Sequence, residues 1–388
     1  MPMIGSLIVV WLVSKFAPEA KGHGVPEVMN SIHNQQSILN APVVLIKALA
    51  SSISIGSGGS VGREGPIVQI CSAIGSVLGQ ICKINTEQRA MFLAAGASAG
   101  IAATFNAPIG GLIFAVELML ININVMSLMI VIITTVTATY ANHYIFGVLP
   151  AFDIPSLRSS LSGVPHPIAM LLFFPLGMLL GGGSALFISF LYKTEDIFNK
   201  FINNIYLRHL CGMTIVGVMF YGLMLYFNHY YINGVGYATI IDILEGVLKD
   251  YRFLLMLFMA KLIATSLTIG TGGSGGIFSP SLFQGACLGA AYGLILDNLF
   301  PGLNLNIVIF TIAGMAGFLS GATGASLTAI VMAFDLTRDY SAILPVMICA
   351  AIANRTRLYF LKDNIYTLKL SRRGINIKQG LKAVGLIK

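Results

Sequence analysis

Long apolar stretches without a charged side chain run through the sequence and limit what it can fold into. Four of them cover residues 3–13, 168–191, 211–227 and 307–334. A helix needs about 20 apolar residues to cross a bilayer, yet these stretches are too long, too short or broken by glycine. Broken and half-length helices are tolerated in a membrane only where protein or water covers their backbone. Because only 10% of all residues are charged, we predict an all-α polytopic membrane protein with broken and half-length helices.

The sequence also repeats itself at a nearly constant spacing. The string IGSGGSVGREGP at residues 55–66 returns 214 residues later, at 269–280, as IGTGGSGGIFSP. Two ordered blocks of this kind predict two structural copies, and an inverted arrangement of the copies is common in transporters with broken helices. Further pairs at spacings of 214 and then 218 are Lys47 with Lys261, Gly75 with Gly289, Gly79 with Gly293, Gly96 with Gly314, and Glu117 with Asp335.

The repeat divides the chain into four parts. We expect a first repeat at 1–145, an inter-repeat loop at 146–164, a second repeat at 165–357, and a last helix with a basic tail at 358–388. The apolar stretch 168–191 finds no counterpart in the first copy, so the first repeat is expected to lack its first membrane helix. The segment 355–388 holds nine Lys or Arg and one acidic residue, which predicts a cytoplasmic C-terminus.

Three glycine-rich breaks end in proline and then enter a helical pattern. They read GHGVPEV at 22–28, GREGPIV at 62–68 and GGIFSPSL at 275–282. Proline suits the first helical turn, and glycine lets backbone N–H groups approach a ligand. Helix N-termini carry free N–H donors and the positive end of the helix dipole, so three that converge predict an anion site. The alternative for each single break is a plain helix kink.

These motifs resemble the CLC family of chloride channels and chloride/proton antiporters. The resemblance rests on GREGP preceded by GSGGS, on GGIFSP in the second half, and on FNAPIGGLIFAVE between them. It implies two inverted repeats, a bacterial plasma-membrane location, a homodimer, and one anion pathway per subunit. The helices after Pro108, at 124–140 and at 325–355 resemble those of the dimer contact. No enzymatic activity and no cofactor beyond bound chloride ions are implied.

The resemblance also implies roles for individual residues. Glu64 of GREGP is the gate, whose carboxylate occupies an anion position, swings away on protonation and carries the proton. The structural alternative is that Glu64 forms a salt bridge with Arg63 and holds the loop. The residues implied to surround the anion are His23, Gly24, Gly62, Arg63 (through its positive potential), Gly65, Ile277 and Phe278 (through their amides), and Tyr366 (through its hydroxyl).

Two positions depart from the family pattern. His23 stands where the family usually has a serine that touches the central anion, so it either faces the anion or turns away to cap a helix or reach water. Leu118 stands where antiporters of the family have a proton-passing glutamate, and Glu117 beside it points about 100° away on a helix. Leucine cannot carry a proton. We therefore expect channel-like chloride transport with weak or absent proton coupling, with Glu117 as a candidate on the inner proton pathway.

Several alternatives stay open or are disfavoured by the residues. A coupled chloride/proton antiporter, or selectivity for another anion such as nitrate or fluoride, remains open because of His23 and Leu118. A cation transporter would use Glu64, Glu117 and Asp335 as ligands. A nucleotide-binding enzyme is disfavoured because no Walker lysine accompanies the glycine-rich string. Nucleic-acid binding is disfavoured because no base-stacking pattern accompanies the basic tail.

Overall fold

The computed structural model describes residues 1–388 except 35, 149–169, 304, 339, 376 and 378–388. The regular elements of the described part are helices, as predicted; the expected inter-repeat loop and the end of the basic tail lie largely outside it. The helices are α1 (Pro2–Phe16), α2 (Val25–Asn34), α3 (Pro42–Gly56), α4 (Glu64–Ile81), α5 (Thr86–Phe105), α6 (Pro108–Phe114), α7 (Val125–Phe146), α10 (Phe173–Phe201), α11 (Ile205–Phe227), α12 (Tyr237–Leu244), α13 (Tyr251–Gly270), α14 (Phe278–Leu299), α15 (Ile307–Thr323), α16 (Ser326–Thr337), α17 (Ile343–Phe360) and α18 (Ile365–Ser371).

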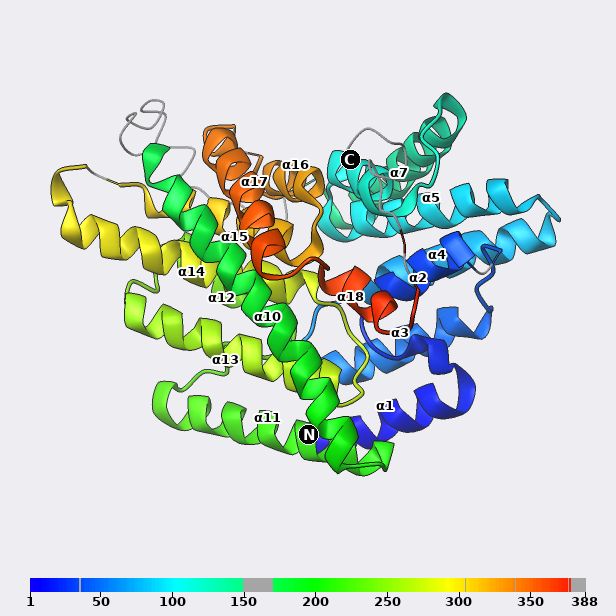
Figure 1. Cartoon of the computed structure of the whole chain (residues 1–388), viewed down its shortest axis with the longest axis horizontal. Coiled ribbons are helices and arrows are strands. Elements are labelled where there is room, and N and C mark those ends of the chain that lie inside the picture. The colour runs from blue at the N-terminus through cyan, green and yellow to red at the C-terminus, as the bar shows by residue number, and fades with distance from the viewer. Residues whose placement is uncertain (35, 149–169, 304, 339, 376, 378–388) are drawn as a thin grey trace.

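Helices of very different length build the molecule. Five segments of the described chain are long and apolar enough to cross a bilayer: α7, α10, α11, α13, and α17 continued by α18. Others are far shorter, such as α2 with 10 residues and α12 with 8. Helices up to α7 lie on one side of the molecule and α10 to α17 on the other, while α18 returns between them (Figure 1). The described chain thus combines full spans with the half-length helices that the sequence predicts.

The two halves form their helices with similar local signals. Asn85 caps α5 by accepting a hydrogen bond from the Gln88 N–H, and Asn306 caps α15 in the same way through the Val308 N–H. Side-chain oxygens at this position satisfy backbone donors that a helix leaves free. Both helices end at a residue with left-handed backbone, Asn106 (φ 55°) and Gly324 (φ 74°). These two residues stand 218 positions apart, at the spacing of the sequence repeat.

Repeat-related glycines let paired helices approach closely. A side chain on Gly75 would collide with the carbonyl of Phe92, where α4 crosses α5. Its counterpart Gly289 meets the carbonyl of Phe310 in the same manner, where α14 crosses α15. Small residues permit such contacts between membrane helices. In both the α4–α5 and the α14–α15 pair, a glycine therefore lets the two backbones come into contact.

The two halves meet at a point between equivalent residues. Gly62 and Gly276, 214 positions apart, form an antiparallel bridge in which each N–H donates to the carbonyl of the other, at 2.7 Å and 2.6 Å. Such mutual pairing of equivalent residues is what a local two-fold relation between the copies produces. The glycine-rich strings of both repeats are thereby joined at the centre of the molecule.

Candidate functional site: an anion site at converging helix ends

Four helix N-termini meet beside this bridge. Three of them, at the starts of α2, α4 and α14, follow the predicted glycine-proline breaks. The fourth belongs to α12, which the sequence analysis missed. Gly24 precedes α2 and Gly236 precedes α12, with φ values of +82° and +86° that favour glycine. The two glycines stand 212 positions apart, so α12 is the second-repeat counterpart of α2.

Most of the predicted anion-site residues line one small cavity. His23, Glu64, Gly65, Ile277, Phe278 and Tyr366 all face it. Apart from Glu64, its walls carry no acidic side chain. Tyr366 is brought there by α18, whose first turn is capped by Asn364 through the amides of Tyr366 and Thr367. The structure thus joins residues that are separated by more than 300 positions in the sequence.

The Glu64 carboxylate is held by donors from the second repeat. It is 1% exposed and accepts hydrogen bonds from the Tyr237 hydroxyl at 2.7 Å and from the Ser279 hydroxyl. The Ser279 N–H, in the first turn of α14, donates to it at 3.4 Å. A carboxylate therefore occupies the N-terminus of α14, the place where helix geometry favours a negative charge.

Tyr237 and Ser279 were missed in the sequence analysis. Tyr237 is the first residue of α12, and the preceding GVG of residues 234–236 matches the GHG of 22–24 at a spacing of 212. No proline follows this break, so it does not match the pattern of glycine followed by proline that identified the other three. Comparison of the two GxG strings is the signal that identifies it.

His23 faces the cavity rather than a helix cap or water. It is 1% exposed, and both ring nitrogens lack a hydrogen-bond partner within the described part of the chain. Its ring centroid lies 5.8 Å from that of Tyr366. An unpartnered buried imidazole in a cavity can accept or donate a hydrogen bond to whatever enters it.

Two other predicted residues, Arg63 and Gly62, do not line this cavity. Arg63 is exposed, and its guanidinium lies over the Tyr237 ring at 5.9 Å from the centroid. The described residues contain no ion pair between Arg63 and Glu64, so the salt-bridge alternative for Glu64 is wrong. The Gly62 amide is committed to Gly276, and so it is not a free donor for an anion.

A groove of about 740 Å³ between α4, α5 and α7 reaches the site from another side. Arg63 and Tyr237 lie in its lining together with Phe105. The guanidinium therefore faces this groove and contributes positive charge next to Glu64. Glu64 itself is not among the lining residues of this groove.

The two carboxylates of the second repeated block cap each other's helices. Glu117 accepts hydrogen bonds from the Leu327 N–H, the Thr328 N–H and the Thr328 hydroxyl at the start of α16. Asp335, near the end of α16, accepts one from the Gly110 N–H at the start of α6. Leu118 is buried among apolar residues, with 2% of its surface exposed.

This reciprocal capping bears on the cation-transporter alternative and on the predicted role of Glu117. Each carboxylate serves as a helix-end acceptor, and no group of three metal-ligating side chains occurs among the described residues. The cation-transporter alternative therefore lacks a ligand set there. The role of Glu117 on a proton pathway stays a prediction.

Two buried lysines support the strings that carry the helix ends. Lys47 donates to the carbonyls of Ala20 and Gly22 at 2.8 Å and 2.7 Å. Its counterpart Lys261 donates to the carbonyls of Ile232 and Gly234. Both lysines are 0% exposed. Each therefore satisfies carbonyls that precede a half-length helix.

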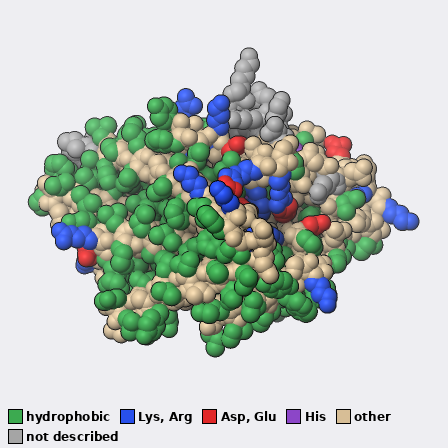
Figure 2. Space-filling view, turned by 60° about the horizontal axis from the view of Figure 1, so that its bottom comes forward, with side chains coloured by type: hydrophobic (Ala, Val, Ile, Leu, Met, Phe, Trp, Pro, Cys, Tyr) green, Lys and Arg blue, Asp and Glu red, His purple; other side chains and the backbone are tan. Residues whose placement is uncertain are grey.

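Charged side chains gather where α18 meets α2. We call Glu27, Lys369 and Arg373 the inner ion-pair cluster. The Glu27 carboxylate lies 3.6 Å from Lys369 Nζ and accepts hydrogen bonds from Arg373 at 2.9 Å and 3.1 Å. Beside it, Arg372 binds Asp196 of α10 through two hydrogen bonds. Figure 2 shows such mixed charges in the middle of an otherwise largely hydrophobic face.

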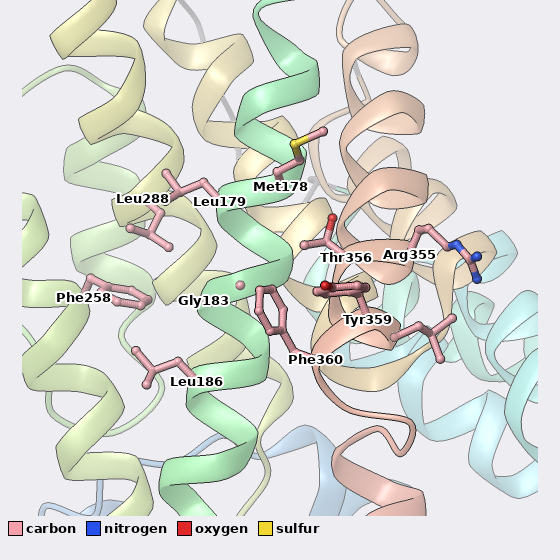
Figure 3. Close-up of a pocket in the computed structure, with 12 residues that line it drawn as sticks. Met178, Leu179, Gly183, Leu186, Phe258, Leu288, Arg355, Thr356, Tyr359 and Phe360 are labelled. Atoms are coloured by element: carbon pink, nitrogen blue, oxygen red, sulfur yellow. The ribbon is translucent and has the colours of Figure 1, made fainter.

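A further large cavity lies elsewhere and is apolar. It has a volume of about 1000 Å³ and opens beside α10, with Leu186, Phe258, Leu288 and Tyr359 in its walls (Figure 3). It shares no lining residue with the Glu64 cavity. Its only charged lining residue is Arg355, whose guanidinium points away from the other labelled side chains (Figure 3). We assign it no part in ion transport.

Known proteins resemble this chain along most of its length. The family described as "Voltage gated chloride channel" matches residues 5–357. An H(+)/Cl(-) exchange transporter ClcA of Vibrio cholerae is 35% identical over 346 residues, which cover 87% of this chain and 71% of the relative. A protein of the same name from Yersinia pestis is 30% identical over 368 residues, with 93% and 75% covered.

Solved structures agree with the architecture. A slow cyanobacterial Cl⁻/H⁺ antiporter superposes with a TM-score of 0.86 and 25% identity, over 96% of this chain and 85% of that one. A CLC-type fluoride/proton antiporter shares the fold with a TM-score of 0.78 at 21% identity, over 95% and 87%. Together with the converging helix ends and the buried Glu64, these similarities show that the chain is an integral membrane protein of the CLC family of anion transporters.

Proposed function

We propose that this protein exchanges chloride for protons. The observation that carries the proposal is the Glu64 carboxylate on the N-terminus of α14, held by Tyr237 and Ser279. In this position the carboxylate competes with an anion for the same donors. Protonation removes its charge and weakens its hold on those donors. One residue thereby links the arrival of a proton to the release of an anion position.

Exchange is preferred here to the channel-like transport that Leu118 led us to expect. The curated relatives from Vibrio cholerae and Yersinia pestis are named as exchange transporters, and the cyanobacterial structure is described as an antiporter. Leu118 excludes proton transfer at its own position only. A proton can reach Glu64 by another titratable group or through water.

The test uses the full chain in liposomes loaded with chloride and held at zero membrane potential. An outward chloride gradient, imposed without a pH gradient, should drive protons into the vesicles of an exchanger. A proton-free chloride efflux under the same conditions would reject exchange and restore the channel. Repeating the measurement with nitrate or fluoride in place of chloride ranks the anions, a point of interest because His23 faces the cavity.

We further propose that the protein is a homodimer in a bacterial plasma membrane, with its basic C-terminal end in the cytoplasm. Apolar side chains stand exposed on the helices expected at the dimer contact, among them Ile109 of α6, Val136 of α7, Leu327 of α16 and Met347 of α17. Their mutual burial would remove apolar surface from lipid and pack two copies together. Cysteines placed at Leu327 and Met347 should cross-link two subunits in membranes, whereas one at Leu255 of α13 should not.

A further inference from the structure

A proton that reaches Glu64 from the side of the inner ion-pair cluster needs a group that can carry it. This question arises only if the protein exchanges protons, so the inference rests on the proposed function. Leu118 has no titratable group, and the Glu117 carboxylate is engaged by three donors of α16. Neither residue offers a free carboxylate. A titratable group closer to Glu64 would be better placed to pass the proton on.

His23 meets the requirements of such a carrier. Its ring shares the cavity with Glu64. Both of its nitrogens are buried and unpartnered, so one can accept a proton while the other gives one away. Glu27, four residues further along the chain, belongs to the inner ion-pair cluster and is partly exposed. A side chain on the adjacent Gly22 would lie 2.6 Å from Lys369 Nζ, so His23 lies close to that cluster as well as to Glu64.

The charges around His23 make its protonated form depend on an anion. Positive groups face it from two elements: Lys47 of α3 is bonded to the neighbouring Gly22 carbonyl, and a side chain on Gly22 would lie 2.6 Å from Lys369 Nζ of α18. The remaining titratable groups around it are Glu64 of α4, Glu27 of α2, Tyr366 of α18, and Arg373 after α18. An imidazolium is repelled by the two lysines and attracted by an anion in the cavity.

We propose that His23 carries the transported proton between the inner ion-pair cluster and Glu64, in place of a glutamate at position 118. One imidazole nitrogen takes a proton from water at the cluster, and the other nitrogen gives a proton to the Glu64 carboxylate once it leaves Tyr237 and Ser279. The imidazole is then neutral but in its other tautomer, and rotation of the ring restores the starting arrangement; Glu64 releases the proton on the opposite side. Because the imidazolium forms readily only beside an anion, His23 transfers protons when an anion occupies the cavity.

The experiment compares proton flux with chloride flux in the same liposomes for the wild type and for His23→Ser and His23→Gln. The ring makes no hydrogen bond that its removal would break, so both variants should fold. General acid–base groups typically accelerate proton transfer by 10²-fold or more. We therefore expect the ratio of proton to chloride flux to fall by about tenfold or more. His33→Ser, near the end of the α2 helix that follows His23 but outside the cavity, is the matched control and should keep the ratio.

The outcomes separate the two proposals. A wild type that couples, together with an unchanged ratio in His23→Ser and His23→Gln, overturns the role of His23 and leaves exchange intact. A wild type that passes chloride without protons overturns exchange and the role of His23 together. An equal fall in His33→Ser also counts against His23, because the loss would then not be specific to the cavity.

Discussion

The Tyr237 hydroxyl donates a hydrogen bond of 2.7 Å to the Glu64 carboxylate, across 173 residues of sequence. The acceptor begins α4 in the first repeat, and the donor begins α12 in the second. Glu64, the proposed gate, is therefore held in place by the half of the molecule that does not contain it. Hydrogen bonds to charged groups contribute about 1.5–3 kcal/mol. This is enough to shift the pH at which the carboxylate leaves its position.

Tyr237→Phe should make the gate open at higher pH. Loss of the hydroxyl removes a donor that favours the ionised carboxylate, so protonation and release become easier. With about 1.4 kcal/mol per pH unit, the midpoint of chloride flux against external pH should rise by roughly one unit. Tyr292→Phe is the matched control, since its hydroxyl donates to the Leu172 carbonyl, away from the site. A midpoint that stays in place would remove Tyr237 from the gate.

Glu64→Gln should mimic the protonated gate. An amide keeps the shape of the side chain but carries no charge at any pH, so chloride flux should continue without its dependence on external pH. Proton flux should disappear. Paired recordings with chloride and pH electrodes check both points. Persistent pH dependence in the variant would mean that another group controls the pathway.

Glu117→Ala should weaken the fold and leave the coupling ratio unchanged. The substitution strands three donors at the start of α16, and lost helix caps typically cost about 0.5–2 kcal/mol. Asp335→Ala should cost a similar amount through α6, because the two caps are reciprocal. Thermal unfolding in detergent measures the stability, and the liposome assay measures the ratio. A stable Glu117→Ala that no longer couples would restore Glu117 as the proton carrier.

Chloride should bind more tightly at low pH because of His23. In the Glu64→Gln background the proton of the gate no longer contributes. The anion favours the imidazolium, and by linkage a lower pH must then favour the anion. Titration calorimetry at about pH 5.5 and about pH 8 spans the usual range of histidine. The gain of several-fold expected at the lower pH should vanish in His23→Ser, and identical behaviour of both proteins would place His23 outside the anion's reach.

The sequence predicts part of this site well and leaves part of it hidden. Proline after a glycine-rich string has a local physical meaning, which is why the starts of α2, α4 and α14 were found. The start of α12 lacks that proline, and so Tyr237 was missed. Contacts such as that of the Ser279 hydroxyl with Glu64 depend on side-chain orientation across 215 residues, which no local pattern contains. His23 could be placed in the cavity only after burial was known.

Mutual bonding of Gly62 and Gly276 has a consequence for biosynthesis. During synthesis the first repeat enters the membrane while its partner is still being made. Until Gly276 arrives, the amide and carbonyl of Gly62 stay unpaired at membrane depth, where each unsatisfied group costs several kcal/mol. Glu64 also lacks its partners at that stage, since Tyr237 is translated 173 residues after it and Ser279 215 residues after it. The first repeat therefore cannot satisfy these groups by itself, and the glycine-rich string of the second repeat supplies the missing partner for Gly62.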